Sequence, residues 1–143
     1  IEAFNRNREP LIIVGKGPEE GKLKKIAGTN IIFKKNLTAA ELLELYQHAA
    51  AYVFAGVEDF GITFAEAQAC GTPVVAYKKG GVLDIVTEET GILFEQPTTA
   101  DIDAAVDKIK KMKLDPSIIR ENSLKFSKAN FKKKIADYIN DRL

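Results

Sequence analysis

The sequence has only one cysteine and one histidine, two residue types that commonly build functional sites. The single Cys70 excludes a disulfide framework and any zinc site made of cysteines. It falls in a run of small residues, so we expect a packed, buried side chain. His48 stands at the end of a predicted helix, where a cation suits the helix dipole, and a catalytic role for it is not favoured.

A large charge of one sign and long apolar runs are also missing. The 21 Lys and Arg residues nearly balance the 20 Asp and Glu residues, which argues against a nucleic-acid-binding protein. There is no apolar run of 18 residues and no signal-peptide pattern, so we expect a cytoplasmic protein. One basic cluster lies near the C-terminal end, and we interpret it as a solvated helix face. The alternative is a weak peripheral contact with the inner face of a membrane. Its lysines are Lys125, Lys128, Lys132, Lys133 and Lys134.

What the chain does have is a strict alternation of short apolar runs with amphipathic helical patterns. The expected strands cover residues 11–14, 31–33, 52–54, 74–76 and 91–94, and the helices between them cover residues 19–27, 39–48, 62–70 and 82–86. This alternation predicts an α/β fold: a Rossmann-like parallel sheet with helices on both faces. Beyond it we expect a helical C-terminal segment, with one helix starting at Asp115-Pro116. The first residues resemble the middle of a helix, so we expect the chain to be part of a longer protein.

The most informative stretch runs from Glu58 to Glu66 and reads Glu-Asp-Phe-Gly-Ile-Thr-Phe-Ala-Glu. Its two carboxylates are eight positions apart, on a glycine-centred loop and on the helix that the loop opens. The free N–H groups of that helix N-terminus would lie between them. In a parallel α/β sheet, ligands bind beyond the carboxyl ends of the strands, where glycines such as Gly80 and Gly81 let a ligand approach the backbone. The stretch therefore predicts a site for an anion flanked by hydroxyl groups, as in a nucleotide sugar.

Several motifs follow one another along the chain. They are Leu11-Ile-Ile-Val-Gly-x-Gly-Pro18, Asn30-Ile-Ile-Phe33, Glu41-Leu-x-x-Leu-Tyr46, Glu58-x7-Glu66-Ala-x-Ala-Cys-Gly-Thr-Pro-Val-Val75 and Gly80-Gly81. Their order resembles the C-terminal half of group 1 retaining glycosyltransferases with the GT-B fold, and the resemblance covers residues 1–143. The amino-acid sequence from Glu58 to Gly71 is most similar to the corresponding segment of mannosyltransferases of polysaccharide and O-antigen assembly.

The resemblance implies one half of a GT-B fold, with residues 1–143 forming the nucleotide-sugar-binding domain. The acceptor-binding N-terminal domain, the first strand of this domain and an Arg/Lys loop for the diphosphate would precede Ile1. The implied reaction moves a hexose, mannose by the narrower resemblance, from GDP-mannose or another nucleoside-diphosphate sugar to a saccharide or lipid-linked acceptor. Neither a metal nor a cofactor is implied. The isolated chain would be inactive, because the acceptor site lies outside it.

The resemblance also implies roles for individual residues. Glu58 would be the catalytic residue and would contact hydroxyls of the donor sugar, whereas Glu66 would bind the ribose hydroxyls. The base would lie along Lys35 and Asn36. The N–H groups of Gly61, Ile62 and Thr63 would hold phosphate and sugar oxygens. Asp59 and Phe60, in the same loop, would also belong to the nucleotide-sugar site.

Two other functions remain open. The first is a non-catalytic domain of the same fold that binds nucleotide sugars or has a regulatory role. The second is a sugar-nucleotide epimerase of GT-B fold, which is disfavoured because its motifs differ around the two carboxylates.

Overall fold

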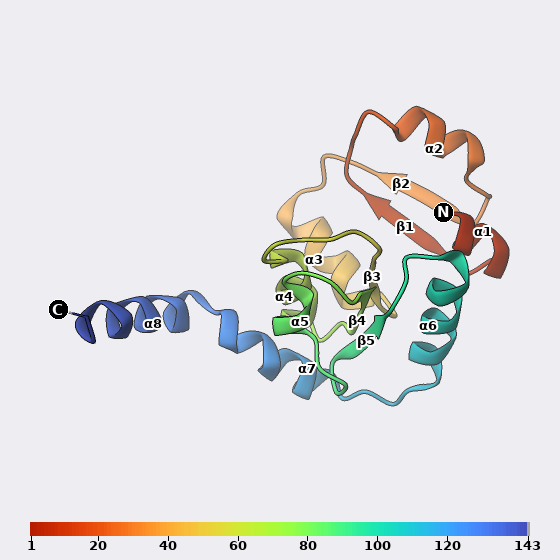
Figure 1. Ribbon diagram of the computed structural model, residues 1–143. Helices are drawn as coiled ribbons and strands as arrows, with labels where there is room; N and C mark the ends of the chain where they lie inside the picture. Colours follow the sequence, from red (N-terminus) through yellow and green to blue (C-terminus); the bar gives the residue numbers. More distant parts are fainter. Residues whose placement is uncertain (143) are drawn as a thin grey trace.

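The computed structural model describes residues 1–142, and it contains parallel strands with helices packed around them (Figure 1). In chain order the elements are α1 (Glu2–Asn7), β1 (Leu11–Val14), α2 (Glu20–Ile26), β2 (Ile31–Lys34), α3 (Ala39–His48), β3 (Tyr52–Phe54), α4 (Ile62–Ala69), β4 (Val74–Tyr77), α5 (Val82–Ile85), β5 (Gly91–Phe94), α6 (Thr99–Lys111), α7 (Pro116–Ser123), the 3₁₀ turn η1 (Leu124–Phe126) and α8 (Lys128–Asn140).

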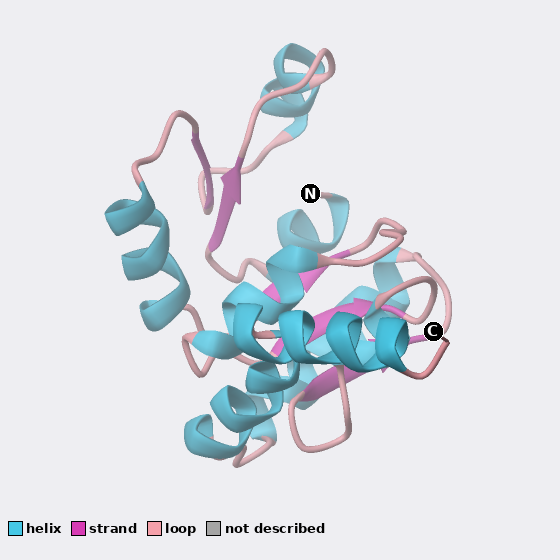
Figure 2. Ribbon diagram, turned by 90° about the vertical axis from the view of Figure 1, so that its left-hand side faces the viewer, coloured by secondary structure: helices cyan, strands magenta, loops and turns pink. Residues whose placement is uncertain are grey.

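The strands form two parallel sheets rather than one continuous sheet. β1 pairs with β2, with Leu11 beside Ile31. The other sheet has the order β3-β4-β5, and Val75 at its centre lies beside Val53 and Ile92. Figure 2 shows the two-stranded sheet standing apart from the three-stranded sheet. The predicted strands and their parallel direction are confirmed. The sequence pattern did not show the division, because it does not specify which strand edges form hydrogen bonds.

The three-stranded sheet is covered on both faces, as the sequence predicted. Residues of the central strand β4, Val74, Val75 and Ala76, are fully buried. On one face Val74 and Ala76 pack with α3, α4 and α5, and on the other Val75 packs with α6. Burying one such valine contributes about 1.5–3 kcal/mol to stability. Because β4 is buried on both faces, its surroundings form the main core of the fold.

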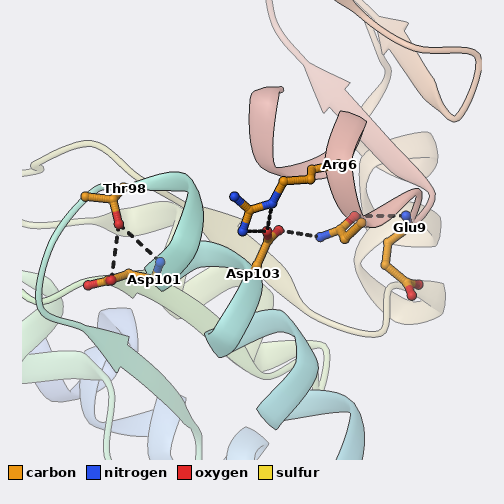
Figure 3. A network of polar contacts seen from close by, with 6 residues as sticks. Arg6, Glu9, Thr98, Asp101 and Asp103 are labelled. Carbon is orange, nitrogen blue, oxygen red and sulfur yellow. Dashed lines mark hydrogen bonds and ion pairs between the residues drawn. The ribbon is translucent and has the colours of Figure 1, made fainter.

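Helix α1 joins the two-stranded sheet to the rest of the molecule. Its Ala3 and Phe4 are buried together with Ile31 of β2 and Val106 of α6. A polar contact reinforces this packing, because the Arg6 guanidinium lies 2.6 Å from the Asp103 carboxylate (Figure 3).

Two further polar contacts fix α6, one to α1 and one at its own start. The Asn7 side-chain amide donates to Asp103 at 2.9 Å. At the start of α6, the backbone N–H of Asp101 donates to the Thr98 hydroxyl at 3.1 Å, a side-chain cap that is also drawn in Figure 3. The contacts of Arg6 and Asn7 with Asp103 hold α1 against α6 and so fix the two-stranded sheet beside the larger one.

The C-terminal segment is helical, as predicted. Asp115 caps α7 by accepting from the backbone N–H of Ser117 at 2.8 Å, and Pro116 occupies the first helical position. Helix α8 extends away from the body of the molecule (Figure 1). Within residues 1–142, no helix is long and apolar enough to cross a membrane.

Candidate functional site

The loop that leads from β3 into α4 carries the two predicted carboxylates. Glu58 lies in the loop and Glu66 lies in α4, about one turn after its first residue, and both are exposed. Gly61 is the N-cap of α4 and has a φ of 84°, a left-handed conformation that favours glycine. A Cβ at this position would lie 2.3 Å from the Phe64 ring, so any other residue would displace the start of the helix.

The first turn of α4 presents free backbone donors between the two carboxylates. The N–H groups of Ile62 and Thr63 are among the first four of the helix and therefore have no acceptor within it. Ile62 is 62% exposed, so ligand atoms can reach this turn from solvent. The structure thus brings Glu58, Glu66 and the helix start to one edge of the three-stranded sheet, as the sequence predicted.

A second loop, between β4 and α5, fixes the position of the Glu58 backbone. The N–H of Gly81 donates to the Glu58 carbonyl oxygen at 2.8 Å, and Gly80 forms an isolated parallel bridge with Glu58. A Cβ at Gly81 would lie 2.4 Å from the Phe60 carbonyl oxygen, and one at Gly80 would lie 2.4 Å from the Glu58 carbonyl oxygen. We expected these glycines to let a ligand approach the backbone. In the structure, the backbone of the loop from Glu58 to Phe60 packs against them instead.

The other two loop residues of the predicted site lie on the same surface. Asp59 is exposed, and its carbonyl oxygen is part of the backbone that packs on Gly81. The Phe60 ring is 57% exposed and meets the Phe126 ring edge-on, with 6.1 Å between the ring centroids. Through this contact the loop is joined to η1, which leads into α8.

Two tyrosines that the sequence analysis did not assign to the site lie beside α4. The Tyr52 hydroxyl donates to the Thr63 hydroxyl oxygen at 3.1 Å. Burial raises the pKa of Tyr46, and the neighbouring Tyr52 and Glu66 raise it further. Burial also raises the pKa of Tyr52; the hydrogen bond with Thr63 opposes this shift, and the Glu58 and Glu66 carboxylates make smaller contributions that raise the pKa. For Tyr52, the signal in the sequence was a polar aromatic residue at the start of an otherwise apolar strand.

Lys35 and Asn36 lie at the carboxyl end of β2, in the other sheet. Asn36 has a φ of 54°, which is uncommon for a residue other than glycine. The Lys35 ammonium is 3.9 Å from the Glu20 carboxylate, and its side chain is exposed. Within residues 1–142 no hydrogen bond or ion pair joins these two residues to the segment from Glu58 to Glu66. The predicted site residues therefore form two groups at the carboxyl ends of two sheets.

Two pockets of about 300 Å³ lie away from the Glu58–Glu66 surface. One lies between β1 and α2 beside the loop from Gly15 to Pro18, and its apolar walls include Leu23 and Phe33. The other lies at the opposite edge of the fold, beside Cys70 and Thr72. Cys70 packs against the main core but is only partly buried, not fully buried as we expected, and burial raises the pKa of its thiol. Neither of these two pockets includes Glu58 or Glu66, both of which are exposed.

Comparison with solved structures defines the fold class. A lipopolysaccharide outer core galactosyltransferase, WaaB, superposes with a TM-score of 0.77 over 94% of this chain and 41% of that protein, at 19% identity. Anabaena Alr3699/HepE, solved in complex with UDP-glucose, gives a TM-score of 0.72 over 98% of this chain and 43% of that one, at 18% identity. The fold is therefore that of one half of a GT-B glycosyltransferase.

The chain belongs to the family described as glycosyl transferases group 1, whose sequence profile matches residues 1–134. A GDP-mannose-dependent monoacylated alpha-(1-6)-phosphatidylinositol monomannoside mannosyltransferase of Corynebacterium glutamicum is 34% identical over 119 residues, 74% of this chain and 30% of that protein. The GDP-mannose-dependent alpha-(1-6)-phosphatidylinositol monomannoside mannosyltransferase of Mycolicibacterium smegmatis is 34% identical over 130 residues, 78% of this chain and 33% of that protein. The chain thus spans about a third of the length of these relatives. The predicted resemblance is confirmed at the level of the family.

Proposed function

We propose that this chain is the donor-binding part of a retaining glycosyltransferase that moves mannose from a nucleoside-diphosphate sugar to a saccharide or lipid-linked acceptor. One observation carries the proposal: in a group 1 family member, Glu58 and Glu66 flank the exposed N-terminus of α4. The acceptor would bind to a part of the protein outside residues 1–143.

Each group at this surface has a distinct task in the proposal. The helix rises 1.5 Å per residue, so Glu66 stands about 6 Å along the axis from Ile62, and its side chain tilts back toward the helix start. A phosphate held by the N–H groups of Ile62 and Thr63 would place an attached ribose within reach of Glu66. Glu58 would accept hydrogen bonds from the donor sugar on the other side. When the sugar leaves, negative charge concentrates on the outer phosphate, where preorganised N–H groups stabilise it most.

GDP-mannose is the donor that we propose. The names of the relatives from C. glutamicum and M. smegmatis give GDP-mannose as their donor and a phosphatidylinositol monomannoside as their acceptor. These names support a mannosyl donor and a lipid-linked acceptor for this protein as well. We propose that Lys35 and Asn36 contact the guanine base, because the left-handed backbone at Asn36 turns the chain at the carboxyl end of β2.

Calorimetric titration of the protein with GDP, UDP, ADP and GDP-mannose tests the proposal. We expect GDP and GDP-mannose to bind more tightly than the UDP and ADP controls. Equal affinity for all four would contradict the choice of donor, and no binding to any of them would contradict the site. Specific binding without sugar transfer in a longer protein that contains this chain would favour the alternative, a non-catalytic nucleotide-sugar-binding domain.

We also propose that α8 makes a weak contact with an anionic membrane surface. Four of its large apolar side chains are 46–63% exposed, and they recur at helical spacing. They are Phe131, Ile135, Tyr138 and Ile139. Lysines flank this face, and such a combination is typical of helices that lie in the membrane interface. Cosedimentation with phosphatidylglycerol vesicles should exceed that with phosphatidylcholine vesicles and should fall when Lys132 and Lys134 are both changed to Gln. Equal cosedimentation with both lipids would contradict this contact.

A further inference from the structure

The Tyr52 side chain links the start of β3 to the first turn of α4. Its hydroxyl lies 3.1 Å from the Thr63 hydroxyl oxygen. Its ring is held among three other aromatic rings, with centroid distances of 5.8 Å to Tyr46, 6.5 Å to Phe54 and 6.0 Å to Phe64. A tyrosine ring packed in this way has little rotational freedom, so its hydroxyl presents a fixed donor to Thr63.

The direction of this hydrogen bond determines where the Thr63 proton can point. A hydroxyl group has one proton and two lone pairs. Since Tyr52 donates, Thr63 accepts with one lone pair, and its own proton is directed away from Tyr52. Thr63 is exposed at the second position of α4. Its proton is therefore available to an acceptor that binds at the helix start.

The surroundings keep Tyr52 in its donor form. Burial raises the pKa of its hydroxyl, the hydrogen bond with Thr63 lowers it, and the negative charges of Glu58 and Glu66 raise it because they disfavour a tyrosinate; the net shift is upward. The hydroxyl thus remains protonated at neutral pH. Thr63, the partner of Tyr52, lies in the first turn of α4, between Glu58 and Glu66 along the chain.

We propose that Tyr52 is a positioning residue of the nucleotide site: it orients Thr63 so that the Thr63 hydroxyl donates to a phosphate oxygen of the bound nucleoside diphosphate. This inference rests on the proposed function of the α4 start. Thr63 then supplies a side-chain donor in addition to the backbone N–H groups, and Tyr52 acts without touching the ligand.

The test compares GDP with guanosine, which lacks the phosphates, by calorimetry on the wild type and on variants. Tyr52→Phe keeps the ring and removes the donor, so we expect GDP binding to weaken about fivefold, as for the loss of one hydrogen bond, while guanosine binding stays unchanged. Thr63→Val should cause a similar loss, and the double variant should lose little more than either single variant. Thr63→Ser retains the hydroxyl and should bind GDP like the wild type.

Tyr77→Phe is the matched control, because Tyr77 stacks on Phe94 in the cluster on the α6 side of the sheet and should not affect GDP binding. If the wild type binds no nucleoside diphosphate, the proposed function fails and this inference fails with it. If the wild type binds GDP and Tyr52→Phe binds it equally well, the inference alone is overturned. Equal losses for GDP and guanosine would indicate a merely structural role and would overturn it as well. Should Tyr52→Phe fail to fold, the comparison of Thr63→Val with Thr63→Ser decides, since equal GDP affinity of these two variants excludes a role for the hydroxyl.

Discussion

The helix that carries Glu66 is anchored by a buried polar network around Gln68. The Gln68 side chain is fully buried, and its amide nitrogen donates to the Thr90 hydroxyl at 3.1 Å. Its amide oxygen accepts from the Asn122 side chain at 2.7 Å, and Asn122 also donates to the Ile85 carbonyl oxygen at 2.7 Å. The network therefore joins α4 to α7, to the end of α5 and to the start of β5.

The substitution Gln68→Leu should destabilise the protein by about 2–3 kcal/mol. Leucine fills a similar volume but leaves one Asn122 N–H without its acceptor, and an unsatisfied buried group costs about 1–3 kcal/mol. Thr90 loses a donor but keeps the bond from the Thr87 N–H at 2.9 Å, so its contribution is smaller. For a chain of this length, 1 kcal/mol corresponds to about 3–4 °C in Tm, so we expect Tm to fall by roughly 6–12 °C.

Urea unfolding followed by circular dichroism measures this change, with Gln47→Leu as the matched control on the exposed surface. The control should differ from the wild type by less than about 0.5 kcal/mol. The double variant Gln68→Leu with Asn122→Leu should lose less than the sum of the two single losses, because both single variants break the same Gln68–Asn122 bond, although the Ile85 carbonyl oxygen then also loses its Asn122 donor. If Gln68→Leu is as stable as the wild type, or if the two losses add without coupling, the energetic role assigned to this network is refuted.

Three further predictions concern the site itself. In a full-length protein that transfers sugar, Glu58→Gln should lower kcat at least tenfold while nucleotide affinity is retained. An unchanged kcat would contradict a role of Glu58 in the reaction. Glu66→Ala should weaken GDP binding about tenfold or more, whereas 2′-deoxy-GDP or 3′-deoxy-GDP should show little further loss in this variant. Additive losses in that cycle would contradict the contact of Glu66 with ribose. Gly81→Ala forces a Cβ to within about 2.4 Å of the Phe60 carbonyl oxygen, so both the melting temperature and GDP affinity should fall, and a variant that keeps both values would show that the loop contact is dispensable.

Much of the fold could be predicted because each element carries its own local signal. The capping box at Thr38 and Glu41 marked the start of α3, and the structure forms both of its hydrogen bonds. Asp115-Pro116 marked the start of α7 in the same way. The separation into two sheets had no such signal, because the runs at residues 11–14 and 52–54 have the same apolar character whichever strands they pair with. Strand pairing depends on contacts between distant segments, which periodicity does not encode.

The candidate site was predictable where its residues are adjacent in sequence, and much less so where they are not. Glu58, Gly61 and Glu66 lie on one loop and the following helix, so their arrangement follows from the helical repeat. The contact between Gly81 and the Glu58 carbonyl oxygen joins two separate loops, and the bond from Tyr52 to Thr63 crosses from a strand to a helix. Only a tertiary structure could show that these residues support the same surface.

The charges around this surface restrict how it can hold a nucleoside diphosphate. Residues 58–66 include three carboxylates, those of Glu58, Asp59 and Glu66, whereas the helix N-terminus contributes only about half a positive charge. In the loop between β4 and α5, Lys78 is already paired with Glu95 at 2.6 Å, and the exposed Lys79 adds a single positive charge, which does not balance the three carboxylates. An anionic diphosphate would therefore meet net repulsion from these side chains. The carboxylates are suited to sugar hydroxyls rather than to phosphates, and we expect the main cationic partners of the diphosphate to come from a segment other than the two loops that surround Glu58.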